Sequence, residues 1–225
     1  MSDTCGNCGA EITSGGIIKG PNRRYSDQQT QILNFVSGTR YTEICEKCGK
    51  GEYETAILSL KGERQKCQDY MTANVVNFPM MTISQIPPGA DCRIKSMVTA
   101  NVTVGTGMFS ELSQGFSDMF GATNVNSGMA LKVNSGEATA RSILVTKAVA
   151  MGANCIIGVD VDYGTTANNA ATVNMQGTAV VIRNLGAILD EDALEKFSQF
   201  EASLARAQEI SRWLAGDLTP DSVPT

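Results

Sequence analysis

The stretch from Gly152 to Tyr163 constrains this fold most, because a glycine able to end a helix is followed at once by an alternating strand. Side chains alternate along a strand, so successive residues point to opposite faces of a sheet. One face is apolar and consists of Ile157, Val159, Val161 and Tyr163. The other face consists of Ile156, Gly158, Asp160 and Asp162. The sequence therefore predicts a strand with one core face and one face that carries two carboxylates.

An amphipathic helix is predicted over residues 137–151, immediately before this strand, and Gly152 marks its end. Its broad apolar stripe consists of Ala140, Ile143, Leu144, Ala148 and Met151. After the acidic strand, residues 172–182 alternate again and predict a further strand. The apolar side of that strand is formed by Val173, Met175, Ala179 and Val181. The predicted unit is helix, strand, turn, strand.

An earlier strand is predicted over residues 93–104. Its apolar side is formed by Val98, Ala100, Val102 and Val104. After a tight turn at 105–107, apolar residues at helical spacing predict a core-building helix over 109–120. Stretches rich in small residues, at 121–136 and 164–171, are predicted to be surface loops. Strands and helices that share one core in this way indicate an α+β domain.

Three pieces of this region match, in the right order, the motifs of a known family. They read VTANVTVGTGMF, EATARSILVTKAVAMGANCIIGVDVDY and MQGTAVVIRN. On these motifs, residues 98–183 resemble the YbjQ family, a group of small bacterial proteins often labelled heavy-metal-binding. The resemblance implies an α+β subunit with an antiparallel sheet that assembles into a homo-oligomeric ring, a pentamer, with no established biochemical activity. Relatives carry a Gly-Gly-Arg turn where residues 120–124 read FGATN, so an anion contact by that arginine is not carried over.

Two CxxC pairs, Cys5 with Cys8 and Cys45 with Cys48, stand in the first part of the chain. Each pair lets two thiolates reach one ion, and four thiolates satisfy tetrahedral zinc. The chain contains no histidine, so a closed four-cysteine site is expected within one subunit, and closed sites are structural. The long segment between the pairs leaves zinc-ribbon and treble-clef types open. Redox-active thiols and an iron site are the alternatives to structural zinc.

Asp160 and Asp162 allow two interpretations. Repeated around a ring, the two carboxylates could form a cation-binding or hydrogen-bonding girdle. The favoured alternative is a solvated strand face, or acids that fix a subunit interface, because hard cations need more oxygen ligands than one short strand supplies. The absence of histidine excludes nucleophilic catalysis of the Ser-His or Cys-His type, and Cys155 is expected to be a small buried residue. The methionines are expected to pack in the core rather than to bind copper or mercury.

Charge and hydropathy exclude several classes of protein. No run approaches the roughly 18 apolar residues of a membrane span, and residues 1–5 do not begin a signal peptide, so a cytoplasmic location is expected. The net charge is −5, and acidic residues are concentrated in 187–225. Nucleic acid is disfavoured, because the small basic face available consists only of Lys19, Arg23, Arg24 and Arg40.

A long amphipathic helix is predicted from Asp190 to Leu214, with acidic residues at its N-terminus. Its apolar stripe includes Leu194, Phe197, Phe200, Leu204, Ala207, Ile210 and Leu214. An exposed apolar stripe of this kind would promote aggregation, so the helix is expected to dock on a neighbouring subunit or on a second copy of itself.

The sequence therefore predicts three consecutive parts: a zinc module at 1–75, a YbjQ-like oligomerisation domain at 76–186, and a C-terminal helix and tail at 187–225. The expected function is a zinc-containing, homo-oligomeric binding or scaffold protein rather than an enzyme. Its protein partners would engage the zinc module or the C-terminal helix. One alternative is a protein that binds or converts a small molecule or metal ion at the Asp160 and Asp162 strand. A second alternative is nucleic-acid binding through the zinc module, which requires Arg23, Arg24, Arg40 and Lys47 to converge.

Overall fold

The computed structural model describes residues 4–13, 22–86, 88–104, 128–165 and 170–216, which form two compact units. The cysteine unit consists of the residues up to Asp69 together with those from Ser203 onward. The sheet unit is Tyr70–Ala202. These units do not coincide with the three consecutive parts predicted above, because two long helices contribute residues to both. Independent folding of the three parts stays a prediction.

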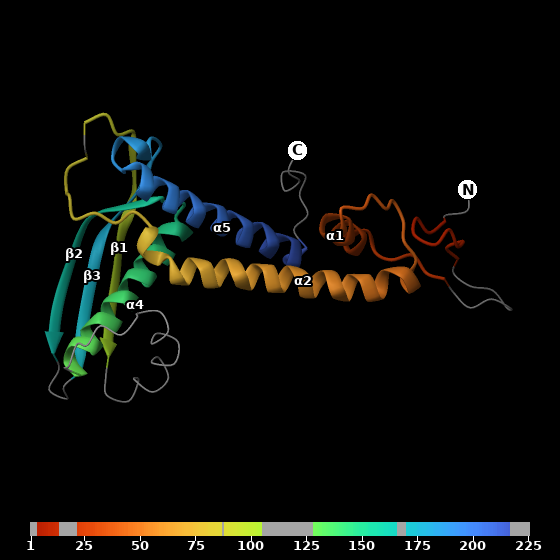
Figure 1. Ribbon diagram of the computed structural model, residues 1–225, viewed down its shortest axis with the longest axis horizontal. Helices are drawn as coiled ribbons and strands as arrows, with labels where there is room; N and C mark the ends of the chain where they lie inside the picture. Colours follow the sequence, from red (N-terminus) through yellow and green to blue (C-terminus); the bar gives the residue numbers. More distant parts are fainter. Residues whose placement is uncertain (1–3, 14–21, 87, 105–127, 166–169, 217–225) are drawn as a thin grey trace. The chain divides into compact units, whose positions relative to one another are not determined.

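The sheet unit contains one antiparallel sheet covered by a helix (Figure 1). Its strands are β1 (Cys92–Val104), β2 (Cys155–Thr165) and β3 (Ala171–Ile182), in the order β1-β3-β2. The helix α4 (Gly128–Ala150) contacts all three strands. The predicted α+β class with an antiparallel sheet is confirmed.

The helix α4 starts earlier than predicted, so the expectation of a loop up to residue 136 is wrong for 128–136. Met129, Ala130, Leu131 and Lys132 are good helix formers, and Gly136 lets the less favourable end of this stretch pack on the sheet. A Cβ on Gly136 would lie 2.8 Å from Val173 Cγ2, so only glycine lets the helix approach β3 this closely. Packing of this face outweighs the low helix propensity of Asn134, Ser135 and Gly136. The predicted turn at 105–107 and helix at 109–120 lie outside the described residues.

A β-bulge at Gly158 corrects the predicted face assignment of β2. Ile157 is paired with Thr178 but Asp160 with Gln176, so β2 has one residue more than β3 across this interval. Gly158 has a φ of 60°, which side chains with a Cβ rarely adopt. Ile156, predicted on the acidic face, is instead fully buried on the face that α4 covers, whereas Ile157 changes to the opposite face.

The outer edge of β2 is partly covered by a segment of the same unit. The backbone of Pro79–Ile83 forms four hydrogen bonds with residues 156–159, among them one of 2.8 Å from the Met81 amide to the Ile156 carbonyl. This segment follows a short 3-10 helix, Val75–Asn77, and a second one, Leu185–Ala187, follows β3. The edge of β1 that faces away from β3 carries no strand within the described residues.

The cysteine unit is built mainly from helices. The helix α1 (Asp27–Ser37) begins with a capping box of Ser26 and Gln29, and α2 (Glu46–Ala73) is continuous past Gly62. The C-terminal helix α5 (Glu191–Ala215) contributes its last three turns. A buried cluster joins the three helices and consists of Ile32, Leu60, Ile210 and Trp213.

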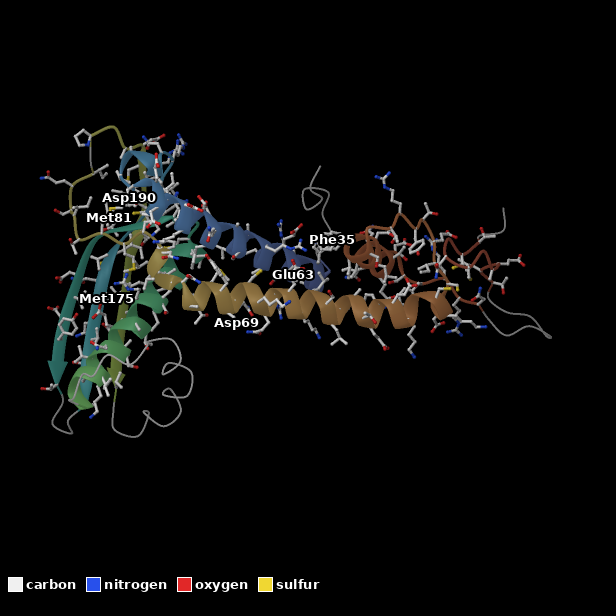
Figure 2. The ribbon with its side chains drawn as sticks, in the orientation of Figure 1. Phe35, Glu63, Asp69, Met81, Met175 and Asp190 are labelled. Atoms are coloured by element: carbon white, nitrogen blue, oxygen red, sulfur yellow. The ribbon has the colours of Figure 1, made fainter. Side chains whose placement is uncertain are left out.

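Within the cysteine unit, an arginine on α5 contacts residues of α1 and α2 beside this cluster. Arg206 forms two hydrogen bonds with Glu63, of 2.7 and 3.0 Å, and its guanidinium lies 5.2 Å from the centroid of Phe35. Glu63 and Phe35 are labelled in Figure 2. Phe35 in turn stacks on Trp213 at 4.3 Å. The pKa of Glu63 is lowered, chiefly by its hydrogen bonds to Arg206.

The first turns of α5 belong to the core of the sheet unit. Phe197 and Phe200 are buried and pack edge-on against Phe78. With Ile210 and Trp213 buried in the cysteine unit, the aromatic and apolar stripe of α5 is largely covered inside one chain. The expectation that this stripe needs a neighbouring subunit for its burial is therefore wrong. Among the described helices, none is both long and apolar enough to span a bilayer.

Candidate metal centre

Each CxxC pair lies in a tight turn that points its sulfurs to one side. In the first turn, the Cys5 amide donates to the Ala10 carbonyl and the Gly9 amide donates to the Cys5 carbonyl, both at 2.8 Å. Gly9 has a φ of 69°, which favours glycine. Cys45 immediately precedes α2, and its carbonyl accepts hydrogen bonds from the amides of Cys48 and Gly49. The second pair therefore stands on the first turn of a helix.

Backbone hydrogen bonds bring the two turns together. The Gly6 amide donates to the Glu43 carbonyl at 2.8 Å, which ties the first turn to the residues before the second. The Tyr25 amide donates to Ile44 and the Glu46 amide donates to Arg23, both at 2.8 Å. The Cys45 amide also donates to the Cys5 sulfur at 3.3 Å. Residues far apart in sequence are thus held around one point.

The four cysteine sulfurs lie within 4.8 Å of one another. A zinc ion with Zn–S bonds of about 2.3 Å in a tetrahedron places its sulfurs about 3.8 Å apart. The Cys8 and Cys45 sulfurs are 3.9 Å apart, so this pair already has the required separation. Cys5 and Cys45 are 2% and 1% exposed, Cys48 is half-buried, and Cys8 is exposed. The donor set and its spacing fit a tetrahedral soft or borderline cation.

The thiols of this centre have shifted pKa values. Burial alone would raise the pKa of the Cys5 thiol, but hydrogen bonds from backbone amides and from Cys8 outweigh burial and lower the pKa to about 6. Burial, together with hydrogen bonds to the neighbouring cysteines, raises the pKa of Cys48 to about 12. Four closely spaced thiols cannot all ionise without a compensating charge. A divalent cation supplies that charge, so the centre is suited to hold one.

Two aromatic residues support the centre from outside. A Cβ on Gly49 would lie 2.7 Å from Tyr25 Cδ1, so α2 can pass this ring only with glycine next to Cys48. Asn34 holds Tyr41 by two hydrogen bonds of 2.9 Å, and the Tyr41 hydroxyl donates to Asn7 at 3.4 Å. These supporting residues were missed from the sequence. The glycine after Cys48 was the only local signal, because the other contacts join distant segments.

The other predicted site residues do not form a metal centre in the described part of the chain, where only the four cysteines are grouped closely enough. Asp160 and Asp162 are exposed on the open sheet face, across from Gln176 and Asn174 of β3. Asp160 accepts a hydrogen bond of 3.4 Å from Gln176. Cys155 is fully buried, and burial raises its pKa to about 12, as expected for an inert core thiol.

The predicted basic face and the methionines have ordinary structural contacts. Arg24 forms ion pairs with Asp27 at 2.7 Å and with Glu43 at 3.1 Å, which reduces its availability for phosphate. Lys19 lies outside the described residues. Met81 and Met175 both pack in or against the core of the sheet unit (Figure 2). Packing, as predicted, accounts for these two methionines.

Part of the chain is similar in sequence to known proteins. The family model YbjQ_1, described as "Putative heavy-metal-binding", matches residues 79–183. A UPF0145 protein from Bifidobacterium longum strain DJO10A is 34% identical over 90 residues, which is 39% of this chain and 80% of that protein. A UPF0145 protein from Bifidobacterium longum subsp. infantis matches with the same identity and coverage.

A solved structure also resembles part of the chain. It is a protein of unknown function of the DUF74 family from Pediococcus pentosaceus, with 16% identity, a TM-score of 0.29, and coverage of 46% of this chain and 95% of that protein. The matched residues 79–183 lie in the sheet unit, whereas the four cysteines lie outside the match. By its sequence match, the chain belongs to the YbjQ family and carries in addition a four-cysteine unit that the family match does not include.

Proposed function

We propose that this protein is a zinc-containing, homo-oligomeric scaffold, in which the sheet unit assembles into a ring and each subunit presents one cysteine unit for partner binding. The observation that carries the proposal is the cluster of four sulfurs within 4.8 Å in a chain without histidine. Four thiolates close a tetrahedral site and leave no position for a substrate, so the role of the metal is structural. No catalytic residue is assigned.

The small core of the cysteine unit supports a structural role. The buried cluster around the centre consists of Cys5, Leu33, Ile44, Cys45 and Ala56, so two of its five members are ligands. A core of this size buries little apolar surface, and small modules of this kind depend on a metal or a disulfide for stability. Zinc is favoured among the cations that accept thiolates because it prefers the tetrahedral geometry that the cluster matches.

Elemental analysis tests the metal assignment. The wild-type protein is expected to bind about one zinc per chain, because four thiolates satisfy one ion. Cys45→Ser should lose most of this zinc, since it removes a buried ligand. Cys67→Ser is the matched control, because Cys67 is a half-buried cysteine on α2 outside the cluster. Equal zinc in wild type and Cys45→Ser contradicts the assignment.

The sheet unit offers edges suited to self-association. The long β1 leaves one edge open and bears Arg93 and Lys95, both exposed. The opposite edge strand, β2, bears the exposed Asp160 and Asp162 beyond the part that Pro79–Ile83 covers. Both edge strands are antiparallel to β3 and hence parallel to each other, so a rotated copy can pair one edge with the other. Head-to-tail contacts of this kind close into rings, and the YbjQ resemblance implies a pentamer.

Charge reversal tests this interface. Native mass spectrometry of the full chain is expected to give a closed oligomer, and Arg93→Glu with Lys95→Glu should lower its subunit number. Adding Asp160→Lys and Asp162→Lys to the same chain should restore it. Lys61→Glu with Lys66→Glu is the control, because both lysines are exposed on α2, in the cysteine unit. A wild-type monomer at micromolar concentration contradicts assembly altogether.

A ring presents several copies of the cysteine unit to one partner. Linked copies raise the effective concentration for the second contact, so even weak partner binding becomes strong. This multivalency is the reason to propose a scaffold rather than a monomeric binding protein.

A further inference from the structure

The four cysteines of the metal centre differ in their access to solvent. Cys5 and Cys45 are buried, Cys48 is half-buried, and Cys8 is exposed. The two residues after Cys8, Gly9 and Ala10, are exposed as well, and no atom lies within 4 Å of a Cβ placed on Gly9. A small oxidant can therefore reach the Cys8 sulfur while the chain is folded.

Cys8 also has a buried thiol partner at short range. Its sulfur lies 3.9 Å from that of Cys45, whereas a disulfide requires about 2.05 Å, so a shift of about 2 Å joins them. Cys45 cannot move easily, because its amide bonds the Cys5 sulfur and its carbonyl accepts two amides of α2. The Cys8 amide also hydrogen-bonds the Cys5 sulfur, but the Cys8 residue is exposed, so rotation of its side chain can bring its sulfur to Cys45.

We propose that Cys8 is an oxidation site through which peroxides open the metal centre, with Cys45 as the resolving cysteine. The inference rests on the proposed function, since it requires a metal held by these thiolates. It concerns a modification of the chain itself, and Cys67, Cys92 and Cys155 take no part in it.

The chemistry balances with a peroxide as oxidant. The Cys8 sulfur attacks one peroxide oxygen, the O–O bond breaks, and protonation releases one water and leaves a sulfenic acid on Cys8. The Cys45 thiolate then attacks the Cys8 sulfur, the S–O bond breaks, and the departing hydroxide takes a proton from solvent and leaves as a second water as the disulfide forms. The two sulfurs lose two electrons and hydrogen peroxide gains them. Cys5 and Cys48 take up one proton each, because two thiolates no longer hold the cation, and the ion leaves.

Oxidation should disrupt the cysteine unit far more than the sheet unit. Cys5 and Cys45 belong to the small buried cluster of the cysteine unit, and loss of the cation removes the charge that lets their sulfurs lie together. The core of the sheet unit contains none of the four ligands. Peroxide would thus unfold the cysteine unit while the sheet unit stays folded.

Zinc release and disulfide mapping on the wild-type protein test the inference. Zinc is counted first by elemental analysis, and a protein without zinc at this stage contradicts the proposed function rather than the inference. Hydrogen peroxide is then added with a chromogenic zinc chelator. The expected result is release of about one equivalent and a peptide pair that links Cys8 to Cys45. Retained zinc, or a disulfide that excludes Cys8, overturns the inference.

Two further measurements guard against a variant that fails to fold. N-ethylmaleimide on the zinc-loaded wild type should label Cys8 before the other three ligands, with Cys67 as an internal reference for a half-buried thiol. Labelling of Cys48 first, or of all four together, contradicts a Cys8 entry point. Cys8→Asp keeps an anionic ligand, since zinc also accepts carboxylate oxygen, and should retain its zinc in peroxide. Release from this variant at the wild-type rate overturns the role of Cys8.

Discussion

The two compact units of this chain are stabilised by different means. The sheet unit has a large buried core that includes all three strands, α4 and the first turns of α5. The cysteine unit has two small clusters, one of which is built partly from the metal ligands. The sheet unit can therefore rely on apolar burial, whereas the proposed metal would have to stabilise the cysteine unit. A perturbation that acts on only one of these sources of stability should therefore unfold one unit and leave the other folded.

Metal removal should produce the largest difference between the units. Structural zinc contributes about 10–16 kcal/mol of binding free energy to small zinc modules at neutral pH, so its loss should unfold the cysteine unit. Trp213 is the only tryptophan and is buried in that unit, so its emission should move to longer wavelength when a strong chelator is added. Amide exchange in β3 should stay slow. Rapid exchange in β3 after chelation means that the units are not independent.

Acidification should have the second largest effect, again on the cysteine unit. The pKa of Cys5 is lowered to about 6, so its thiolate contributes stability that is fully present above the unfolded thiol pKa and is lost as pH falls through about 6. Protons also compete with the cation for every thiolate. Zinc content measured after dialysis should therefore fall between pH 7 and pH 5. Zinc that remains fully bound at pH 5 argues against thiolate ligation.

Truncation of a core side chain should instead destabilise the sheet unit and leave the cysteine unit unchanged. Leu144→Ala on α4 removes a fully buried side chain and should lower the free energy of unfolding of the sheet unit by about 3 kcal/mol, with zinc content unchanged. Denaturant unfolding followed by exchange of β-strand amides measures this loss. Leu131→Ala is the matched control on the same helix, because Leu131 is 47% exposed, and it should cost less than about 0.5 kcal/mol. Equal losses of unfolding free energy for the two variants would mean that Leu144 is not part of the core.

Two helix glycines should give the smallest effects, with opposite signs. Gly136→Ala introduces a Cβ 2.8 Å from Val173 and should destabilise the sheet unit by about 1–3 kcal/mol. Gly62→Ala on α2 meets no atom within 4 Å and should stabilise its helix by about 0.5–1 kcal/mol. Thermal unfolding of both variants tests the signs. Stabilisation by Gly136→Ala would mean that α4 is not tightly packed on β3.

Several parts of the candidate site were predictable from local sequence. The spacing of Cys5 with Cys8 and of Cys45 with Cys48 placed two thiols in each turn, and the structure brings all four together. The helix that follows Asp190 was also predictable from local sequence. Each of these local features is closed by hydrogen bonds between residues only a few positions apart, whereas the meeting of the two cysteine turns depends on distant segments.

The faces of β2 and the start of α4 were not predictable in this way. Strict alternation placed Ile156 with the acids, but the left-handed conformation of Gly158 inserts an extra residue and exchanges the faces of Ile156 and Ile157. Small and polar residues such as Asn134, Ser135 and Gly136 indicated a loop, yet Gly136 lets the helix pack closely on Val173. Both outcomes depend on β3, which is distant in sequence.

The sequence by itself determined the two CxxC pairs, the absence of histidine chemistry, the α+β class and the family of residues 79–183. Only the tertiary structure decided which ligand faces solvent, how α5 is divided between two cores, and which strand edge stays open. The physical reason is the range of the interactions. Turns, caps and ligand pairs are set by neighbours along the chain, whereas burial is set by side chains that folding brings from far away.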